Sequence, residues 1–482
     1  MVNFIESIIN TTLNRKKALT LSMSENGDRA SFSGKIGFVL AASASAVGLG
    51  NLWRFPYLTS HYGGGIFVII YIILALTFGF SLMIAEVALG RKTGKSCISA
   101  FGDLCAKYKW IGIVAALIPL LIVPYYCVIG GWVTKWFVTS GVGELDTLAD
   151  DGYWWNYITG EISGMADPAS WFIIFALLCV ACVAIGVERG IEKLSKILMP
   201  ALFIMMIGII IYEFTLPNIW SGVDFYLNPD VSKLSAGTFL GAISQIFYSM
   251  SLAMGIMITY GSYMKKDVSI ERSARNIGVI DTGVAILAGL MIIPAAFIMS
   301  PDLANQGGMG LMFVALPQVF ESMPAGEIVA PIFYLLVLFA AMTSAVSLLE
   351  TVVSVFVDLK ALRRKKSIII STVLVILLGI LSVMGFGPWM IDIGPFSQGA
   401  GWLGIFDSLT NSVMMPIIAI LTCIFIGYVI KVTVITDEVK AEGHAFMFEK
   451  PFVIMIKYVC PILLTFMLIF GLLDLFGVFS LY

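Results

Sequence analysis

The polar residues of this sequence that could do chemistry lie inside apolar stretches, and the first group falls in residues 36–58. This stretch, IGFVLAASASAVGLGNLWRFPYL, is apolar enough to cross a bilayer, yet small residues and glycines interrupt it before Asn51 and Arg54. The hydrocarbon core offers no hydrogen-bond partners, so a helix that breaks there must direct its freed backbone groups to a cavity, an ion or a ligand. Polar residues inside a membrane are costly and by default functional. The expected chemistry is therefore solute binding during transport.

A second interrupted segment lies five apolar segments later, at residues 236–264. It carries the run of polar and small residues from Ser249 to Gly255 at its middle. Small residues in membrane helices often serve only close helix packing. Two interruptions at the first position of two five-helix halves instead favour an inverted-repeat transporter with a central binding site.

Enzymatic constellations are not evident in this sequence. Cys179 and Cys182 have CxxC spacing, but they lie in an apolar helix and are interpreted as packing residues; the chain has only two histidines, so a His-based metal cluster cannot form. Gly48-x-Gly50 resembles part of a dinucleotide-binding loop but lacks the third glycine and the β-α-β setting. We therefore expect no enzyme and no nucleic-acid partner.

The elements that must position these residues are membrane-spanning helices. Of 482 residues, 59% are hydrophobic and only 12% are charged, with seven cysteines in all; soluble proteins carry about twice that share of charge. Each apolar segment is near or above the roughly 20 residues that a spanning helix needs. Eleven are expected, at about 35–60, 66–90, 110–139, 169–187, 192–215, 236–264, 275–299, 329–358, 367–387, 400–430 and 450–480.

The basic residues predict the orientation of the chain. The connections after the even-numbered spans are basic and the opposite loops are acidic; of 29 Lys and Arg, only Arg54, Lys135 and Lys233 fall towards the second side. By the positive-inside rule the N-terminus is cytoplasmic, and eleven spans leave the C-terminus outside. Residues 1–34 are interpreted as a cytoplasmic tail, because their basic residues follow a weakly apolar start, unlike a cleavable signal.

Several motifs resemble the neurotransmitter:sodium symporter family. They are AVGLGNLWRFPY, GGG at 63–65, FxIxY at 67–71, PYYCVIGGW, SQIFYSMSLAMG and FAAMTSAVSLLE, and the likeness covers about 29–430. The resemblance implies an all-α polytopic membrane protein with the LeuT fold, a 5+5 inverted repeat in which helices 1 and 6 are broken. The repeats would be about 35–215 and 236–430, a ten-helix transport core of 35–430. Residues 431–482 would form a cytoplasmic loop and an eleventh helix, because the usual twelfth helix is absent, as in an eleven-helix bacterial subgroup.

By this resemblance, two sodium ions bind at the midplane. The first site would use Asn51, Ser249 and Asp281 with the Ala46 carbonyl and the substrate carboxylate. That shared ligand would couple ion to substrate, because each binds poorly without the other. The second site would use the carbonyls of Ala44, Val47 and Ala340 and the hydroxyls of Thr343 and Ser344.

The substrate is expected between the two breaks. Half-helix N-termini would hold its carboxylate near the Gly48 and Gly50 amides and the Tyr126 hydroxyl. The mostly apolar lining favours a neutral, hydrophobic or aromatic amino acid. The full expected set is Gly48, Gly50, Ile122, Tyr126, Tyr248, Ser249, Ser251, Met254, Ser344 and Leu348.

Asp281 also predicts transport independent of chloride. Chloride-dependent members of the family have a neutral residue here and a serine four residues later, whereas this chain has Asp281 and Ala285. A fixed carboxylate beside the first sodium supplies the negative charge that chloride would bring. The alternative is that Asp281 is a helix-end residue facing the cytoplasm.

The resemblance further predicts two gates and one supporting residue. Outside the substrate, Arg54 would pair with Asp407, with Tyr126 and Tyr248 closing beneath and Gln245 bracing Arg54. On the cytoplasmic side, Arg29 would pair with Asp358, with Phe32 and Tyr263 around them; Arg29 could also be an ordinary positive-inside residue. Glu86 would accept hydrogen bonds from freed amides of the sixth span.

The predicted function is sodium-coupled symport of a neutral amino acid across the cell inner membrane by alternating access. Two sodium ions moving down a tenfold gradient and 100 mV supply about 7 kcal/mol. A sodium-dependent amino-acid sensor without transport, or a symporter of another small zwitterionic solute, remains the alternative. A sensor could lose a gate pair, and both pairs are present in the sequence.

Overall fold

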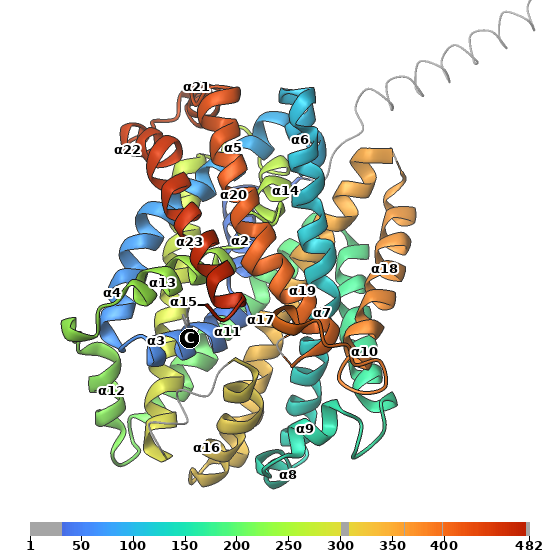
Figure 1. Ribbon diagram of the computed structural model, residues 1–482, viewed down its shortest axis with the longest axis vertical. Coiled ribbons are helices and arrows are strands. Elements are labelled where there is room, and N and C mark those ends of the chain that lie inside the picture. The colour runs from blue at the N-terminus through green and yellow to red at the C-terminus, as the bar shows by residue number, and fades with distance from the viewer. Residues whose placement is uncertain (1–30, 300–307, 361, 398, 479–482) are drawn as a thin grey trace, which may run out of the picture.

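The computed structural model describes residues 31–299, 308–360, 362–397 and 399–478 and is built from helices that run along one long axis (Figure 1). In these ranges no β-strand is formed, and the one bridge joins Gly64 to Pro229. One end of the bundle, uppermost in Figure 1, carries α6 (Cys97–Leu104) and α21 (Thr433–Val439). The opposite end carries α8 (Leu145–Ala149), α9 (Tyr153–Ile158), α12 (Ile219–Leu227) and α16 (Leu316–Ser322).

Membrane-spanning helices account for nearly all of the bundle. Nine helices of the described ranges are long and apolar enough to cross a membrane, and a pair bent by 51°, Lys35–Ala46 with Gly50–His61, makes a tenth. The nine are Gly65–Thr93, Ala106–Gly141, Ala166–Ile185, Val187–Glu213, Ile270–Ile298, Gly326–Leu359, Arg364–Met384, Gly401–Val429 and Glu449–Leu475. The remaining predicted span is a second interrupted helix, whose two parts are each too short to qualify alone.

The first break separates α2 (Lys35–Ala46) from a π-helical turn (Gly50–Arg54) that continues into α3 (Phe55–His61). Val47 ends α2 in an extended conformation, with φ −72° and ψ 103°. The Asn51 side-chain oxygen accepts a hydrogen bond from the Gly48 amide at 3.1 Å, which satisfies one of the backbone groups freed by the break.

The second break separates α13 (Ala236–Ser249) from α14 (Ile256–Ser262). Ser251, Ala253 and Gly255 all have positive φ, of 53°, 61° and 71°. Left-handed backbone costs a residue with a Cβ roughly 1–2 kcal/mol, so Ser251 and Ala253 are held there by their surroundings. Strain of this kind is typical of binding sites.

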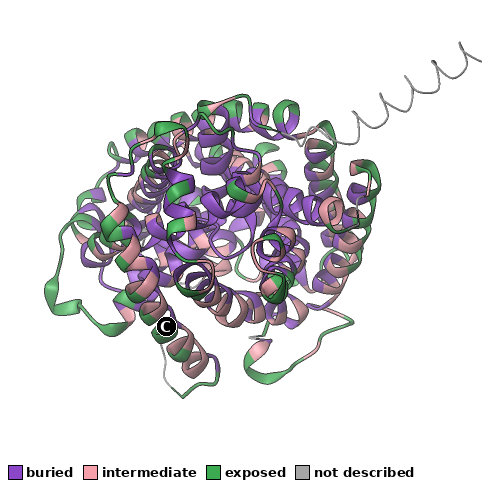
Figure 2. Ribbon diagram, turned by 90° about the horizontal axis from the view of Figure 1, so that it is seen from above, coloured by how far each residue is buried: buried purple, intermediate pink, exposed green. Residues whose placement is uncertain are grey.

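The interior of the bundle is formed by long helices that pass beside the two breaks. These are α7 (Lys109–Gly141), α15 (Ile270–Met299) and α17 (Gly326–Lys360), and buried residues are concentrated around the bundle axis in Figure 2. Other helices, which include the peripheral α10, α18 and α23, have exposed apolar residues suited to lipid. They are α4 (Gly65–Leu74), α10 (Ala166–Ile185), α11 (Lys193–Glu213), α18 (Arg364–Met384), α20 (Met415–Ile424), α22 (Glu449–Ile454) and α23 (Cys460–Leu475). The helices α5 (Phe80–Thr93) and α19 (Gly401–Asp407) have no exposed apolar residue.

Glycines bring α5 and α14 into backbone contact. A Cβ at Gly90 would lie 1.9 Å from the Ile258 carbonyl oxygen, and one at Gly261 would lie 2.3 Å from the Val87 carbonyl oxygen. Backbone atoms cannot move aside as a flexible side chain can, so both positions require glycine. The second part of the sixth span, α14, is therefore packed tightly on the second span.

We predict that Gly90→Ala lowers the thermal stability of the detergent-solubilised protein, because the added methyl group forces α5 and α14 apart. Overpacking of this kind costs about 1–3 kcal/mol. The matched control is Gly208→Ala in α11, where nothing lies within 4 Å of the added Cβ. Equal melting temperatures for the two variants would contradict the close packing of α5 and α14.

Candidate functional site

A narrow cavity lies where the two helix breaks meet α7 and α17. Its volume is about 30 Å³, counted as the space open to the centre of a water-sized sphere. Its lining is Ser45, Ala46, Gly48, Leu49, Gly50, Ile122, Tyr126, Tyr248, Ser251, Met254, Ile256, Ser344 and Leu348. Nine of the ten predicted substrate residues are in this lining; Ser249 lies beside it in a polar cluster. Sequence reasoning missed Ser45, Leu49 and Ile256, since nothing in their types distinguishes them from packing residues.

Gly48 and Gly50 allow the first break to approach the facing helices closely. A Cβ at Gly48 would lie 2.5 Å from the Ser344 hydroxyl, and one at Gly50 would lie 2.5 Å from the Tyr248 ring. The Leu49 amide, between them, donates a hydrogen bond to the Tyr126 hydroxyl at 3.3 Å. The exposed backbone of the break and the Tyr126 hydroxyl therefore face the same cavity.

A polar cluster around Asp281 adjoins the cavity. Asp281 is fully buried, and its Oδ1 accepts hydrogen bonds from the Asn51 amide at 2.9 Å and the Ser249 hydroxyl at 2.8 Å. The Tyr71 hydroxyl lies 3.4 Å from Ser249 Oγ and from Asp281 Oδ2. Three predicted side chains of the first sodium site thus converge. Tyr71 was part of the FxIxY motif but had no predicted role.

The composition of this cluster suits a singly charged cation. Oxygen ligands are those that hard cations prefer. Asp281 is its one carboxylate, and within the described ranges no three His, Cys, Asp or Glu side chains gather as a metal site. One buried carboxylate balances one positive charge, whereas a divalent ion would leave an excess of charge in a low-dielectric interior.

Hydroxyls of α17 meet the end of α2 on the other side of the cavity. The Ser344 hydroxyl donates to the carbonyl oxygens of Ser45 (3.0 Å) and Val47 (3.3 Å), and the Thr343 hydroxyl donates to that of Ala340 (3.0 Å). The carbonyl end of a helix is the negative end of its dipole. Four members of the predicted second sodium site are therefore adjacent, and Ala44 is buried one turn earlier on α2.

Arg54 and Asp407 line a second, larger cavity of about 790 Å³, which Tyr248 also borders. Arg54 donates to Gln245 Oε1 at 3.2 Å and to Ser244 Oγ at 2.6 Å, and Gln245 Nε2 donates to the Gly50 carbonyl at 2.8 Å. The bracing of Arg54 by Gln245 is thus as expected from the sequence, and Ser244 was missed. Tyr248 separates this cavity from the narrow one.

Asp407 is held in place by neighbours that the sequence analysis did not name. Its Oδ1 accepts hydrogen bonds from the Tyr125 hydroxyl at 3.0 Å and from the Asn411 amide at 2.6 Å. Pairing of Asp407 with Arg54 stays a prediction.

The structure describes three of the four residues predicted for the second gate, at the end of the bundle near α6. Arg29 lies outside the described residues, so its pairing with Asp358 stays a prediction; the Asp358 carboxylate accepts from the Ser96 amide at 2.6 Å. The Phe32 amide donates to the Tyr263 carbonyl at 3.2 Å, and their rings meet edge-on at 6.1 Å.

Glu350 and Arg364 adjoin the residues predicted for this gate and were missed in the sequence. The Tyr263 hydroxyl donates to Glu350 at 2.8 Å, and Glu350 forms an ion pair with Arg364 at 2.6 Å. Glu350 is fully buried. An acidic residue within the apolar run SAVSLLE was the available signal.

Glu86 of α5 supports the second break. Its Oε1 accepts a hydrogen bond from the Ala253 amide at 2.7 Å, at the point where φ is positive. This is the contact with a freed amide of the sixth span that the sequence predicted. It secures an amide that has no partner within a helix.

These features define a class of protein before any comparison is made: a polytopic helical membrane protein with an enclosed site at two helix breaks, the architecture of a secondary transporter. The comparisons identify the family. The profile of the Sodium:neurotransmitter symporter family matches residues 29–157 and 149–478, and the chain belongs to this family. Its members are transporters and not enzymes, as the sequence predicted, and the family establishes sodium use.

Individual relatives agree with this assignment. An uncharacterized sodium-dependent transporter of Bacillus subtilis, YhdH, is 32% identical over 92% of this chain and 98% of its own. The sodium- and chloride-dependent taurine transporter of Canis lupus familiaris is 27% identical over 79% and 70%. The crystal structure of MhsT in complex with L-phenylalanine superposes with a TM-score of 0.82, at 35% identity, covering 92% of this chain and all of that one. The predicted LeuT fold is confirmed.

We predict that Glu86→Leu destabilises the protein because it leaves the buried Ala253 amide without an acceptor, at a cost of about 1–3 kcal/mol. Glu86→Gln is the matched control, since its side-chain carbonyl can still accept that hydrogen bond. Thermal unfolding of both variants in detergent measures the difference. A melting temperature of Glu86→Leu equal to that of Glu86→Gln would show that the hydrogen bond does not support the break.

Proposed function

We propose that this protein is a symporter that couples two sodium ions to the uptake of a neutral, hydrophobic or aromatic amino acid by alternating access, without chloride. The observation that carries the proposal is the narrow cavity between the two helix breaks, which is lined by backbone and hydroxyl groups together with apolar side chains. The polar clusters of Asp281 and Ser344 flank it and supply the two sodium sites.

The polar groups of the cavity lining fit the two charged groups of an amino acid. The backbone amides around Gly48 and Gly50 lie at the start of a half-helix, whose positive dipole end attracts a carboxylate, and the Tyr126 hydroxyl can donate to that carboxylate. Carbonyl oxygens of the strained segment around Ser251 would accept from the amine. A carboxylate bound beside Asn51 and the Ala46 carbonyl would also be a ligand of the first sodium, which makes binding of ion and substrate mutually dependent.

The apolar residues of the cavity lining set the class of substrate side chain. Ile122, Met254, Ile256 and Leu348 offer no partner for a charged group, and burying an unpaired charge is costly. The phenylalanine held by MhsT supports an apolar amino acid as substrate. Met254 is unbranched and adapts its shape, so the pocket accepts side chains of more than one form.

Alternating access would use the two ends of the bundle. By the distribution of Lys and Arg, the end with α6 and α21 is cytoplasmic, which leaves the N-terminus inside and the C-terminus outside. The larger cavity, bordered by Arg54, Asp407 and Tyr248, is then the outer vestibule. The Phe32 and Tyr263 contacts close the inner path.

The first prediction of this proposal is concentrative uptake into proteoliposomes. A panel of radiolabelled amino acids is offered with an inward sodium gradient, and with potassium alone as the control. Neutral apolar amino acids should accumulate only with sodium, because the ion completes the substrate site. Sodium-dependent binding without accumulation would favour the sensor, and accumulation of a different zwitterion would correct the substrate class.

The second prediction concerns chloride. Uptake by the natural sequence should be unchanged when chloride is fully replaced by gluconate, because the Asp281 carboxylate supplies the negative charge. Asp281→Asn combined with Ala285→Ser should make uptake depend on chloride, since Ala285 is buried one helical turn from Asp281. Ala285→Ser alone is the matched control and should remain independent. Loss of wild-type uptake without chloride would reject this role of Asp281.

A further inference from the structure

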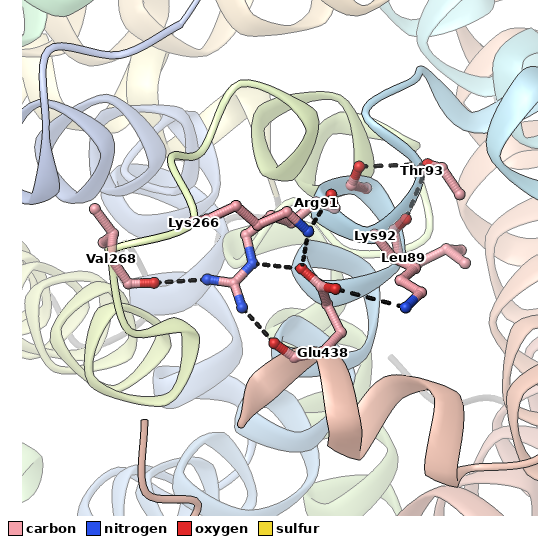
Figure 3. Close-up of polar contacts among 8 residues, drawn as sticks. Leu89, Arg91, Lys92, Thr93, Lys266, Val268 and Glu438 are labelled. Carbon is pink, nitrogen blue, oxygen red and sulfur yellow. Dashed lines mark hydrogen bonds and ion pairs between the residues drawn. The ribbon is translucent and has the colours of Figure 1, made fainter. Parts of the chain in front are cut away.

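Between the last two spanning helices, residues 433–448 are fastened across one end of the bundle by a buried acidic residue. Glu438 of α21 is only 3% exposed. Its Oε1 lies 2.8 Å from Arg91 Nε of α5 and 2.6 Å from Lys266 Nζ of the connection between α14 and α15 (Figure 3). We call Arg91, Lys266 and Glu438 the inner charge cluster.

Arg91 joins three parts of the chain that are far apart in sequence. Besides the Glu438 carboxylate, its guanidinium donates to the Glu438 carbonyl oxygen and to the Val268 carbonyl oxygen, the latter at 2.6 Å (Figure 3). Arg91 is also 3% exposed. A buried ion pair of this kind costs desolvation to form, and removing one partner leaves an uncompensated buried charge. It therefore holds a defined geometry, unlike an exposed surface pair.

A second carboxylate fastens the other end of the segment. Glu271, in the first turn of α15, accepts hydrogen bonds from the Met447 amide at 3.0 Å and from the Phe448 amide at 3.1 Å. The segment is thus tied at both ends to elements that belong to the second, sixth and seventh spans.

The connection that the inner charge cluster holds also carries the inner gate. At its start, the Tyr263 carbonyl accepts from the Phe32 amide, and Lys265 Nζ donates to the Ser33 carbonyl at 3.0 Å. Further along the connection, Lys266 belongs to the inner charge cluster, and the Val268 carbonyl accepts a hydrogen bond from Arg91 of that cluster. Because α14 is packed on α5 through Gly90, a displacement of the gate must move both helices or break the cluster.

We propose that the inner charge cluster is a latch by which residues 433–448 hold the substrate path closed on the cytoplasmic side. It ties α5 and the α14–α15 connection to the last two spans, so its release favours the inward-open state. A contact that forms in only one of two states shifts the equilibrium towards that state by the free energy of the contact. The inference rests on the alternating access proposed above. It adds the element that sets the equilibrium between the inward-closed and inward-open states.

Cys97 of α6 provides a native reporter for the test. It is fully buried, and its Sγ lies 3.0 Å from the position of a Cβ on Gly255, at the start of α14. Movement of α14 away from α6 would expose this thiol. The experiment measures alkylation of Cys97 by a maleimide in saturating sodium, with the labelled peptide quantified by mass spectrometry. We expect Glu438→Gln to label several-fold faster than the natural sequence.

Two further variants keep the test decisive. Lys440→Gln in the same segment removes an exposed pair with Glu449 and should leave the labelling rate unchanged. Lys266→Gln touches only the solvent side of the cluster, since its side chain is 52% exposed, and should give a smaller increase even where Glu438→Gln does not fold. Natural labelling rates in the folded cluster variants would overturn the latch.

The outcome is separable from the proposed function. Labelling of Cys97 requires no uptake, so the comparison of variants tests the latch by itself. Absence of sodium-driven uptake in the natural sequence, measured in the same proteoliposomes, would reject the symporter. Where uptake is present, a faster Cys97 label in Glu438→Gln should accompany a lower apparent affinity for external amino acid.

Discussion

The structure depends on one constraint: a backbone amide or carbonyl inside the hydrocarbon region must find a partner within the protein. Two spans interrupt their helix beside the same cavity, next to Gly48 and at Ser251–Gly255. Each freed backbone group that is hydrogen-bonded within the protein, such as the Ala253 amide with Glu86, stabilises the break. The groups left facing the cavity become the binding surface. Scaffold and site therefore arise from the same interruptions.

Few charged side chains lie around the narrow cavity, and electrostatics explains why a cation would need only one of them. Around the narrow cavity, Asp281 is the one carboxylate that belongs to a polar cluster with Asn51 and Ser249, and carbonyl and hydroxyl oxygens supply the rest. Neutral oxygens stabilise a cation without adding a second buried charge, which would have to be compensated when the ion leaves. Such a site can be filled and emptied, as a transport cycle requires, whereas a multi-carboxylate site would retain its ion.

The polar contacts at the two ends of the bundle differ in kind. Beside the larger cavity, Arg54 lies over the Tyr248 ring and donates hydrogen bonds to the side chains of Ser244 and Gln245. At the opposite end, buried carboxylates are paired with basic side chains, as in Glu350 with Arg364 and Glu438 with Arg91. Breaking buried pairs is expensive, which makes them suited to holding one state until ion and substrate have bound.

The sequence by itself determined the spans and the fold class, because lipid imposes long apolar runs and makes every interruption conspicuous. Motifs around Asn51, Ser249 and Ser344 that resemble the symporter family also predicted most of the residues that line or adjoin the narrow cavity. Only the tertiary structure decided that Glu438 meets Arg91, 347 residues away, that Tyr71 joins Asp281, and that Ala253 accepts a positive φ. Pairings between distant helices depend on packing register and on which neighbour approaches at an ångström scale, and a single sequence contains no local signal of either.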